Sequence, residues 1–349
     1  MHREFPEISE REWDVLRCIV ELYILRAEPV GSETLRLSFD RPYSAATIRN
    51  VMSRLTQLGF LEQPHTSAGR IPTELAYRYF VNRARNTGAI DDRIRREIKH
   101  AFSDNNQAVS AVLDGTAGVL SKITPYTGFI VCLPFAFSRL RYLDFVHIHE
   151  HRVLVLLTTE AGFVSRREIE TEQIYIQDEL DRCARFINVN YAGHLLADIR
   201  QSLIGELVEE RIRFDRMLRA VKQLGAAATG CADDVELYLG RITNILEQPE
   251  FTQGTSEALR EILRIFEEKG KVLRILNKFL EGDPVRVVIG SELAYSALEP
   301  LSMISARYRQ FDRTVGSLGI IGPKRMPYPT IISLVEYAAD QLTLYLSKN

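Results

Sequence analysis

The stretch ATIRNVMSRLTQLGFLEQPHTSAGR, residues 46–70, decides the fold of the N-terminal part of this chain. Its first half has apolar residues at helical spacing, which predicts an amphipathic helix over residues 45–58 with Ser44 as its N-cap. Its second half is polar and contains Pro64 and Gly69, which favour a turn. The short segments FLEQ and RIPT lie on either side of this polar tip and can pair as a small hairpin.

Two further helices are expected before this one. Ser9 and Glu12 have the spacing of a capping box and begin a helix that ends near Ala27. Ser32 is the expected N-cap of a second, short helix. Three short helices followed by a small hairpin are typical of a winged helix-turn-helix, in which the third helix enters the major groove of DNA and the hairpin lies beside it.

The polar face of the third helix carries side chains that can hydrogen-bond base edges or phosphates, and none of them is acidic. The hairpin adds small hydrogen-bonding residues and a cation suited to phosphate contacts. The candidate DNA-binding residues are Ser44, Thr47, Arg49, Asn50, Ser53, Arg54, His65, Thr66, Ser67 and Arg70.

Charge is distributed unevenly over this region. Residues 1–40 contain five Arg and nine Asp or Glu, a net charge of −4, whereas residues 41–85 contain seven Arg and two Glu, a net charge of +5. A local basic block is the electrostatic feature expected for a polyanion partner. For the third helix alone, a solvated face followed by an ordinary turn is a sufficient explanation, but the helix spacing, the hairpin and the charge shift together favour DNA binding.

Three segments resemble the HrcA family of bacterial heat-inducible transcription repressors: EPVGSETL (28–35), SAATIRNVMSRLTQLGFLEQPHTSAGRIPTELAYRYFV (44–81) and VGSLGIIGPKRMPYPTIISLVEY (315–337). The resemblance extends over the whole chain, and ATIRN followed by LEQPHTSAGRIPT is its most specific part. Glu33 and Ala45 depart from the family pattern, which often has a basic residue and a proline at these positions. Because an acid near the DNA backbone would repel phosphate, we do not expect Glu33 to contact DNA.

The resemblance implies an α+β multidomain protein with an N-terminal winged helix-turn-helix over residues 1–85. It also implies a GAF-like α/β domain over 86–135 and 231–349, and an inserted dimerisation domain over 136–230, built from a three-stranded sheet plus helices. The implied function is that of a homodimeric repressor of chaperonin and DnaK-type chaperone operons. It implies binding to double-stranded DNA at an inverted-repeat operator, called CIRCE, with activity maintained by the GroE chaperonin. A dimer suits an inverted repeat because one winged helix contacts only a half-site.

Beyond residue 85 the sequence predicts alternating helices and strands. Residues 90–126 are expected to be helical, residues 178–224 to form two or three helices, and residues 330–346 to form a closing helix. Small residues over 224–234 predict a break, and exposed apolar positions on helices 178–224 are the expected dimer contacts. The expected strands are FIVCLPF (129–135), RLRYLDFVHI (139–148), RVLVLLTTE (152–160), GFVSRREIE (162–170), ELYLGRITNIL (236–246), VRVVIG (285–290), ISARYRQF (304–311) and VGSLGIIG (315–322).

Composition places the protein in the cytoplasm. The four cysteines, Cys18, Cys132, Cys183 and Cys231, are scattered without a CxxC pair, and we expect buried free thiols, as in a reducing compartment. The charged N-terminus is unlike a secretory signal, and the longest apolar run is far shorter than the roughly 20 residues of a spanning helix. We therefore expect a soluble bacterial protein that associates with the nucleoid when bound to DNA and not with a membrane.

Two motifs suggest chemistry but favour simpler interpretations. HIHEH, residues 147–151, brings three histidines together, yet a hairpin tip rarely gives metal geometry, so a solvated turn is favoured over a metal site. VGSLGIIGPKR, residues 315–325, matches neither a dinucleotide-binding nor a P-loop pattern. We expect a strand and a tight turn here, with Lys324 and Arg325 solvated and a helix starting after Pro329.

No constellation typical of an enzyme is found in the sequence. It contains no Ser/His/Asp set, nucleophile elbow or metalloprotease motif, so we expect no catalysis, no cofactor and no metal. GAF domains often hold small ligands, and the alternative function is therefore a small-molecule-sensing GAF and winged-helix regulator. Palindrome-specific, salt-dependent DNA binding without added ligand would favour the repressor, and ligand-dependent binding would favour the sensor.

Overall fold

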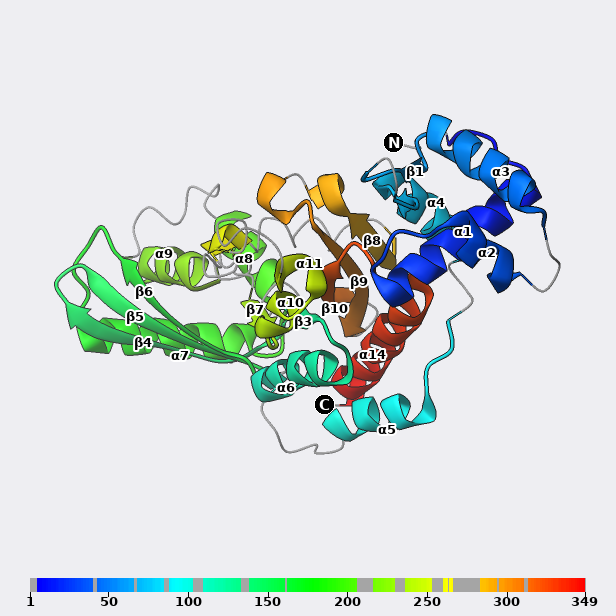
Figure 1. Ribbon diagram of the computed structural model, residues 1–349. Helices are drawn as coiled ribbons and strands as arrows, with labels where there is room; N and C mark the ends of the chain where they lie inside the picture. Colours follow the sequence, from blue (N-terminus) through cyan, green and yellow to red (C-terminus); the bar gives the residue numbers. More distant parts are fainter. Residues whose placement is uncertain are drawn as a thin grey trace.

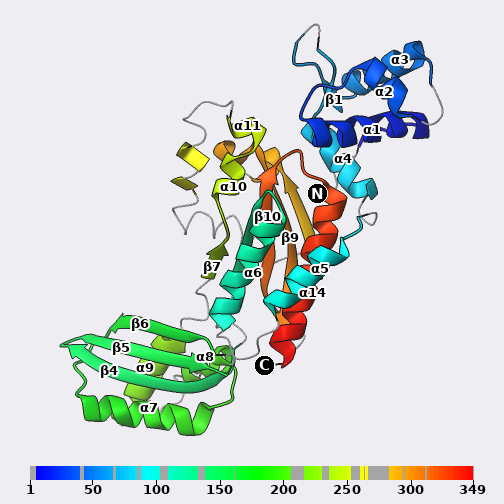
Figure 2. The same ribbon diagram turned by 60° about the horizontal axis from the view of Figure 1, so that its bottom comes forward.

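The computed structural model consists of three units, each with its own antiparallel sheet (Figures 1 and 2). Among the residues that the structure describes, the N-terminal unit has two strands, the central unit five and the distal unit three, which is a mixed α/β architecture. In both views the central unit lies between the other two. The structure describes residues 5–39, 43–65, 68–84, 88–102, 109–132, 138–160, 162–205, 216–229, 236–252, 260–262, 264–265, 283–293, 295–310 and 313–348.

The N-terminal unit has three helices, a hairpin and a fourth helix. Its elements are α1 (Glu10–Arg26), α2 (Ser32–Ser38), α3 (Ala45–Gln57), β1 (Leu61–Glu62), β2 (Ile71–Pro72) and α4 (Glu74–Ala84). The capping box predicted for α1 is present, because the Ser9 amide donates to Glu12 Oε2 at 2.7 Å and the Ser9 side chain accepts from the Glu12 amide. The N-cap predicted for α2 is wrong by one residue: Gly31 is the cap and Ser32 is the first helical residue. Val30, just before it, is held extended by backbone hydrogen bonds to Arg70.

Apolar side chains from α1, α2 and α3 form one core in this unit. The most deeply buried of them come from all three helices and from the start of the hairpin, and each contributes about 1.5–3 kcal/mol by leaving water. They are Leu16, Ile19, Leu35, Ile48, Leu55 and Phe60. Because α3 directs this stripe inward, its polar residues face outward.

The hairpin is short and closely packed at its base. Leu61 pairs with Pro72 and Glu62 with Ile71, and a further bridge joins Val30 to Arg70 through two N–O contacts of 2.9 Å. A Cβ atom at Gly69 would lie 2.5 Å from the Val30 carbonyl, so only glycine fits where the hairpin passes the strand-like segment before α2.

The central unit is a five-stranded antiparallel sheet. Its strands are β3 (Thr127–Cys132), β7 (Glu236–Leu239), β8 (Val285–Ile289), β9 (Leu301–Gln310) and β10 (Arg313–Pro323), in the order β7-β3-β10-β9-β8. Its helices are α5 (Asp92–Ala101), α6 (Val109–Ile123), α10 (Thr243–Leu246), α11 (Pro249–Thr252) and α14 (Tyr328–Lys348), with 3-10 turns η4 (Gly290–Leu293) and η5 (Ser296–Leu298). Alternate residues of β3 belong to two separate apolar clusters: Ile130 packs in the cluster that includes α6 and α14, and Phe129 in the one that includes α10 and α11. The sheet is therefore buried on both faces.

Three sequence expectations for the central and distal helices are corrected. Residues 243–246, expected in a strand, form the helical turn α10. The Asn244 side chain fastens this turn by donating to the Ser121 carbonyl of α6 at 2.7 Å and to the Tyr126 carbonyl, just after α6, at 2.8 Å. The expected break over 224–234 does not begin at 224, because α9 continues to Thr229. The closing helix starts at Tyr328, before Pro329 rather than after it.

The distal unit lies between β3 and β7 in the sequence. Its elements are β4 (Leu140–His149), β5 (Arg152–Thr159), β6 (Val164–Glu170), α7 (Gln177–Tyr191), α8 (Leu196–Gly205) and α9 (Arg216–Thr229). The three strands and the helices match the sequence expectation. Since β3 and β7 are neighbours in the central sheet, the distal unit is an insertion into the central unit.

The two faces of the three-stranded sheet differ. One face is covered by the helices, and its residues Leu143, Phe145 and Val155 are almost completely buried. The apolar residues of α7 pack inward in the same way, so most of them are not the exposed dimer contacts expected from the sequence. Val189 of α7 is exposed, as expected for these helices, and further exposed apolar side chains lie on the opposite face of the sheet, which carries Tyr142, Val146, Ile148 and Val164. We call this opposite face the outer sheet face.

The described cysteines are free thiols, and the histidines of residues 147–151 are exposed. Cys18, Cys132 and Cys183 are free thiols, and burial raises the pKa of Cys132 to about 12 and that of Cys183 to about 11, so both are protonated and unreactive. Cys231 lies outside the described residues. The histidines of the 147–151 stretch are exposed, and no group of three or more His, Cys, Asp or Glu that could hold a metal ion occurs among the described residues. Within the same residues, no helix has both the length and the apolar character needed to cross a membrane.

Candidate nucleic-acid interface

Helix α3 presents a polar face to solvent. Ile48, Val51, Met52 and Leu55 are buried, while the side chains on the opposite side are exposed, apart from the half-buried Thr47. The exposed residues of this face are Ser44, Ala46, Arg49, Asn50, Ser53, Arg54 and Gln57. Arg and Asn are the residue types that pair bidentately with guanine and adenine edges in the major groove.

The N-terminal end of α3 is built to favour an anion. The Ser44 hydroxyl accepts a hydrogen bond from the Thr47 amide at 3.1 Å and lies 2.8 Å from the Thr47 hydroxyl. The first turn contains no acidic residue. Because the amide dipoles of a helix make its N-terminus partly positive, this end is suited to a phosphate group. Ser44 and Thr47 therefore shape the N-terminal end of α3.

The exposed cations of α3 are not equivalent. Arg54 Nε lies 2.8 Å from Oε1 of Glu12, which is almost completely buried at the start of α1. A backbone hydrogen bond from Ser9 lowers the pKa of Glu12 against the opposing effect of burial, and Arg54 lowers it further. Arg54 is thus fastened to α1, whereas Arg49 and Asn50 make no side-chain hydrogen bond to any other residue that the structure describes.

The hairpin base is fixed to the end of α3. Arg70 is half-buried, and its Nε donates to the Thr56 hydroxyl at 3.1 Å. His65 is exposed near the tip, where the Gln63 side chain donates to the Ala68 carbonyl at 3.0 Å. Arg70 therefore supports the hairpin as well as contributing positive charge. Thr66 and Ser67 lie outside the described residues.

One acidic residue near this surface is neutralised locally. Glu33 at the start of α2 accepts hydrogen bonds from Arg36, at 3.0 Å from Nε and 2.6 Å from a terminal nitrogen. The hydrogen bond from Arg36 lowers the pKa of Glu33, and the nearby charge of Arg49 lowers it further. Because Arg36 neutralises Glu33, this acid is tolerated beside the exposed face of α3, which itself carries no acidic residue.

Several supporting residues were missed by reasoning from the sequence. Thr56 and Glu12 hold Arg70 and Arg54, and Gly69 permits the close approach of the hairpin. Glu12 was predicted as a capping residue, but nothing local signals that it also binds an arginine more than 40 residues away. Gly69 was predicted as a turn former, which is part of its role.

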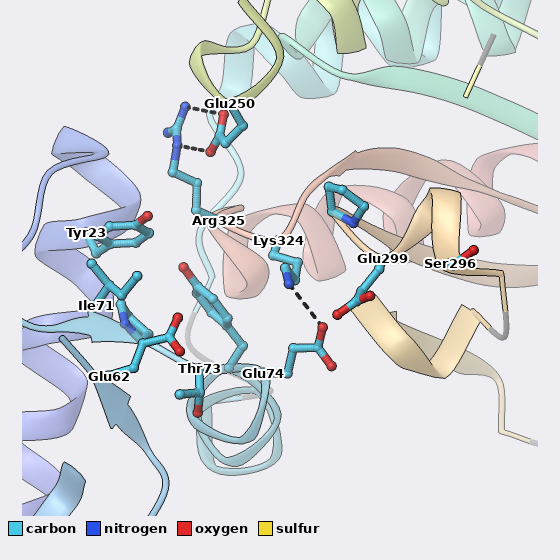
Figure 3. A pocket seen from close by; sticks show the side chains of 13 residues that line it. Tyr23, Glu62, Ile71, Thr73, Glu74, Glu250, Ser296, Glu299, Lys324 and Arg325 are labelled. Carbon is cyan, nitrogen blue, oxygen red and sulfur yellow. Dashed lines mark hydrogen bonds and ion pairs between the residues drawn. The ribbon is translucent and has the colours of Figure 1, made fainter. Parts of the chain in front are cut away.

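The opposite side of the N-terminal unit is docked to the central unit (Figure 3). Lys324 and Arg325, expected to be solvated, both make contacts across this junction. Lys324 Nζ donates to Glu74 Oε1 of α4 at 3.0 Å. Arg325 donates to the Ile24 carbonyl of α1 at 3.0 Å, and its Nε lies 2.5 Å from Glu250 Oε1. The expectation is wrong because these partners lie far away in the sequence.

Together, the acid-free helix face, the adjoining hairpin and their mounting on a larger α/β body are features of a multidomain transcription regulator. The family model for the HrcA protein C-terminal domain matches residues 110–332. The chain belongs to the HrcA family, whose members are transcription repressors and not enzymes. Its membership implies DNA binding and a role in the heat-shock response.

Full-length relatives support this assignment. The heat-inducible transcription repressor HrcA of Geobacter sulfurreducens is 36% identical over 97% of this chain and 98% of its own length. The protein of the same name from Syntrophobacter fumaroxidans is 34% identical, with 98% of each chain covered. A crystal structure of a hypothetical protein at 2.2 Å resolution has the same fold, with a TM-score of 0.64 and 24% identity, covering 98% of this chain and 99% of the other.

Proposed function

We propose that this protein represses heat-shock operons by binding, as a homodimer, an inverted-repeat operator of the CIRCE type. In this proposal the N-terminal unit is a winged helix-turn-helix, α3 reads the major groove, and the β1–β2 hairpin is the wing against the backbone. The observation that carries the proposal is the exposed face of α3, on which Arg49 and Asn50 make no side-chain hydrogen bond to the described residues, which has no acid, and which begins at a capped helix end.

We further propose that the three units correspond to domains. The winged helix would comprise residues 1–85, a GAF-like domain residues 86–135 and 231–349, and a dimerisation domain residues 136–230. The distal unit is inserted between β3 and the edge strand β7 of the central sheet, and this supports the division. An insertion next to an edge strand leaves the core of the central unit intact.

The outer sheet face is the best candidate for the dimer contact. It combines exposed Tyr142, Val146 and Ile148 on β4 with the half-buried Leu154 and Leu156 on β5. Charged side chains of both signs adjoin these residues, including the Arg152–Glu168 pair at 3.2 Å. An apolar centre with charges of both signs around it can match a second copy of itself about a two-fold axis.

The β4 edge of this sheet is a poorer candidate than its face. The Asn188 side chain of α7 accepts from the Leu143 amide and donates to the Leu143 carbonyl, both at 2.8 Å. The Gln177 side chain of α7 binds β4 in a similar way: it accepts from the His147 amide and donates to the Phe145 carbonyl, both at 2.9 Å. Side chains of α7 thus occupy the free edge of β4, which disfavours pairing with a strand from another chain.

Chaperonin dependence is supported by the same surface. A single protomer leaves the outer sheet face in water, and exposed apolar surface favours aggregation and capture by chaperones. In this proposal the GroE chaperonin raises the fraction of protomers that reach the dimer, and unfolded protein competes for it during stress.

The dimer surface can be tested by placing a charge in its centre. We expect Val146→Asp to shift the protein from dimer to monomer in sedimentation experiments and to weaken binding to the inverted repeat toward that of a half-site. Leu344→Asp, which alters an exposed leucine on α14 (53% exposed), is the matched control and is expected to leave both properties unchanged. A Val146→Asp protein that stays dimeric would exclude the outer sheet face as the contact.

A further inference from the structure

A cavity of about 600 Å³ lies at the junction of the N-terminal and central units (Figure 3). Its walls come from α1, the hairpin and the start of α4 on one side, and from α11, η5 and the segment that joins β10 to α14 on the other. The interface proposed for DNA does not use it. Because each unit supplies one wall, anything bound in this cavity contacts both units.

Two of the carboxylates in this cavity are already neutralised. Glu74 receives hydrogen bonds from Lys324 Nζ at 3.0 Å and from the Ser291 hydroxyl at 2.6 Å. Glu250 is paired with Arg325, whose side chain is only 13% exposed. These pairs account for both cations among the described residues that line the cavity.

Two further carboxylates are left over. Glu62 on β1 and Glu299 just after η5 line the cavity, are exposed, and form no ion pair with any other residue that the structure describes. Figure 3 shows them on opposite walls, each extending toward the space between the units. The cavity therefore carries an excess of two negative charges, which repels anions and attracts a cation.

A buried hydroxyl provides an independent indication of a ligand. Tyr77 on α4 lines the cavity and is 3% exposed, yet its hydroxyl has no hydrogen-bond partner among the described residues. The groups that act on it electrostatically include Tyr23, Glu250 and Arg325, all of which also line the cavity. Leaving a buried polar group unpaired is unfavourable, and a ligand with an N–H donor would remove this penalty.

We propose that this cavity is a binding site for a small organic cation carrying primary ammonium groups, such as an aliphatic diamine. Glu62 and Glu299 supply the countercharge, the Tyr77 hydroxyl accepts a hydrogen bond from the ligand, and Tyr23 offers an aromatic ring to its ammonium or methylene groups. A divalent metal fits less well, because the described residues contain no group of three or more His, Cys, Asp or Glu that could hold one.

Such a ligand would act on the orientation of the N-terminal unit. A molecule that contacts both walls stabilises the docked arrangement relative to any arrangement in which the units separate. By linkage, the factor by which the ligand changes the affinity for DNA equals the factor by which DNA changes the affinity for the ligand. This coupling rests on the proposed DNA-binding function, whereas binding of the cation itself does not.

The test is calorimetric titration of the full-length protein with putrescine, without DNA. We expect saturable binding of one putrescine per chain that is weakened at least tenfold by Glu62→Gln, by Glu299→Gln and by Tyr77→Phe. Glu172→Gln, at an exposed position in the distal unit, is the control and is expected to bind as the unchanged protein does. Sodium chloride and magnesium chloride at equal ionic strength separate specific binding from charge screening.

Each outcome decides the proposal. Saturable binding that the three cavity variants weaken and the control retains would establish the site. No saturable binding, equal binding in all variants, or heat that sodium chloride reproduces would overturn it. Because the titration contains no DNA, its failure leaves the repressor proposal untouched, and failure of operator binding leaves the cavity result standing.

Discussion

The exposed face of α3 and helix α4 differ in how their charged side chains are paired. On the α3 side, the exposed Arg49 makes no side-chain hydrogen bond within the described part of the chain. On the α4 side, Glu74 and Arg78 are both fastened to the central unit. The comparison shows that charges paired inside the chain fix the orientation of the unit, while charges left free are available to a partner outside it.

Docking of α4 to the central unit depends on a close approach of the Glu74 side chain to the backbone of Gly290. Arg78 is bonded to the Glu292 carboxylate and donates to the Val287 carbonyl at 2.8 Å. Gly290 has a φ of +54°, and a Cβ atom there would lie 1.9 Å from Glu74 Oε1. The turn of η4 can therefore receive the Glu74 carboxylate only with glycine at this position.

The largest effect is expected when the fastened side is broken. Arg78→Ala removes the partly exposed ion pair with Glu292 and the hydrogen bond to the Val287 carbonyl, and we expect a loss of about 2–3 kcal/mol in the free energy of unfolding. Arg93→Ala, which removes a pair exposed on α5, is expected to cost less than about 1 kcal/mol. Denaturant unfolding of the two variants measures the difference, and equal losses would mean that the junction does not hold the units together.

The next effect concerns the free side. Arg49→Ala and Asn50→Ala are each expected to weaken operator binding by about 1–3 kcal/mol and to relax base preference, with little change in stability. Arg17→Ala, a half-exposed cation on α1, serves as the control. Fluorescence anisotropy with operator and scrambled DNA gives both quantities. If the α3 variants bound like the control, α3 would not be the reading helix.

Two substitutions at Ser44, the N-cap of α3, separate helix stability from DNA binding. Ser44→Ala removes the hydrogen bond to the Thr47 amide, and we expect a loss of about 1 kcal/mol in unfolding free energy. Ser44→Asp restores the cap but places a negative charge beside the expected phosphate. We therefore expect Ser44→Asp to match the unchanged protein in thermal stability and yet to bind DNA less well. Unimpaired binding by Ser44→Asp would place the phosphate elsewhere.

A smaller effect on affinity is expected at the hairpin base. Arg70→Ala should weaken binding to every DNA sequence alike and reduce the slope of log affinity against log salt by about 1. Because Arg70 also donates to Thr56, a small loss of stability is expected as well. A change in sequence preference without a change in salt slope would contradict a backbone role for Arg70.

The smallest effect is a dependence of junction stability on pH. Burial raises the pKa of Glu74, but hydrogen bonds from Ser291 and Lys324 and the charge of Lys324 outweigh it and leave the pKa below the ordinary value of 4.5. A carboxyl whose pKa is lower folded than unfolded stabilises the protein above the unfolded pKa, and this contribution is lost as the pH falls through the folded pKa. We expect Glu74→Gln to reduce the loss of stability below about pH 4.5, and an unchanged acid profile would show that Glu74 does not contribute.

Local signals in the sequence predicted the elements that depend on neighbouring residues. The capping box of α1, the Ser44 cap and the polar face of α3 all follow from spacing within one or two helical turns. The start of α2 was predicted one residue late because Val30 is bound to Arg70, forty residues further along the chain. Lys324 and Arg325 were expected in solvent because their partners Glu74 and Glu250 are distant in sequence.

The sequence predicts which residues make up the candidate DNA-binding surface, but not which of them are paired within the chain. The sequence indicates that Arg49, Arg54 and Arg70 lie near one another on a basic surface. It contains no sign that Arg54 is bound to Glu12 or that Arg70 supports the hairpin, since both contacts depend on tertiary packing. The apolar outer sheet face was also missed, because strand alternation does not show which face the helices cover.

Quantitative gel-shift binding tests the central claim most directly. The full-length protein is titrated against an inverted-repeat operator and against the same DNA with one arm scrambled, with and without GroE chaperonin. Tight binding that requires both arms, and an active fraction that rises with chaperonin, is the predicted result. Equal affinity for the two DNAs would contradict the account, because a dimer that reads two half-sites must lose affinity when one of them is destroyed.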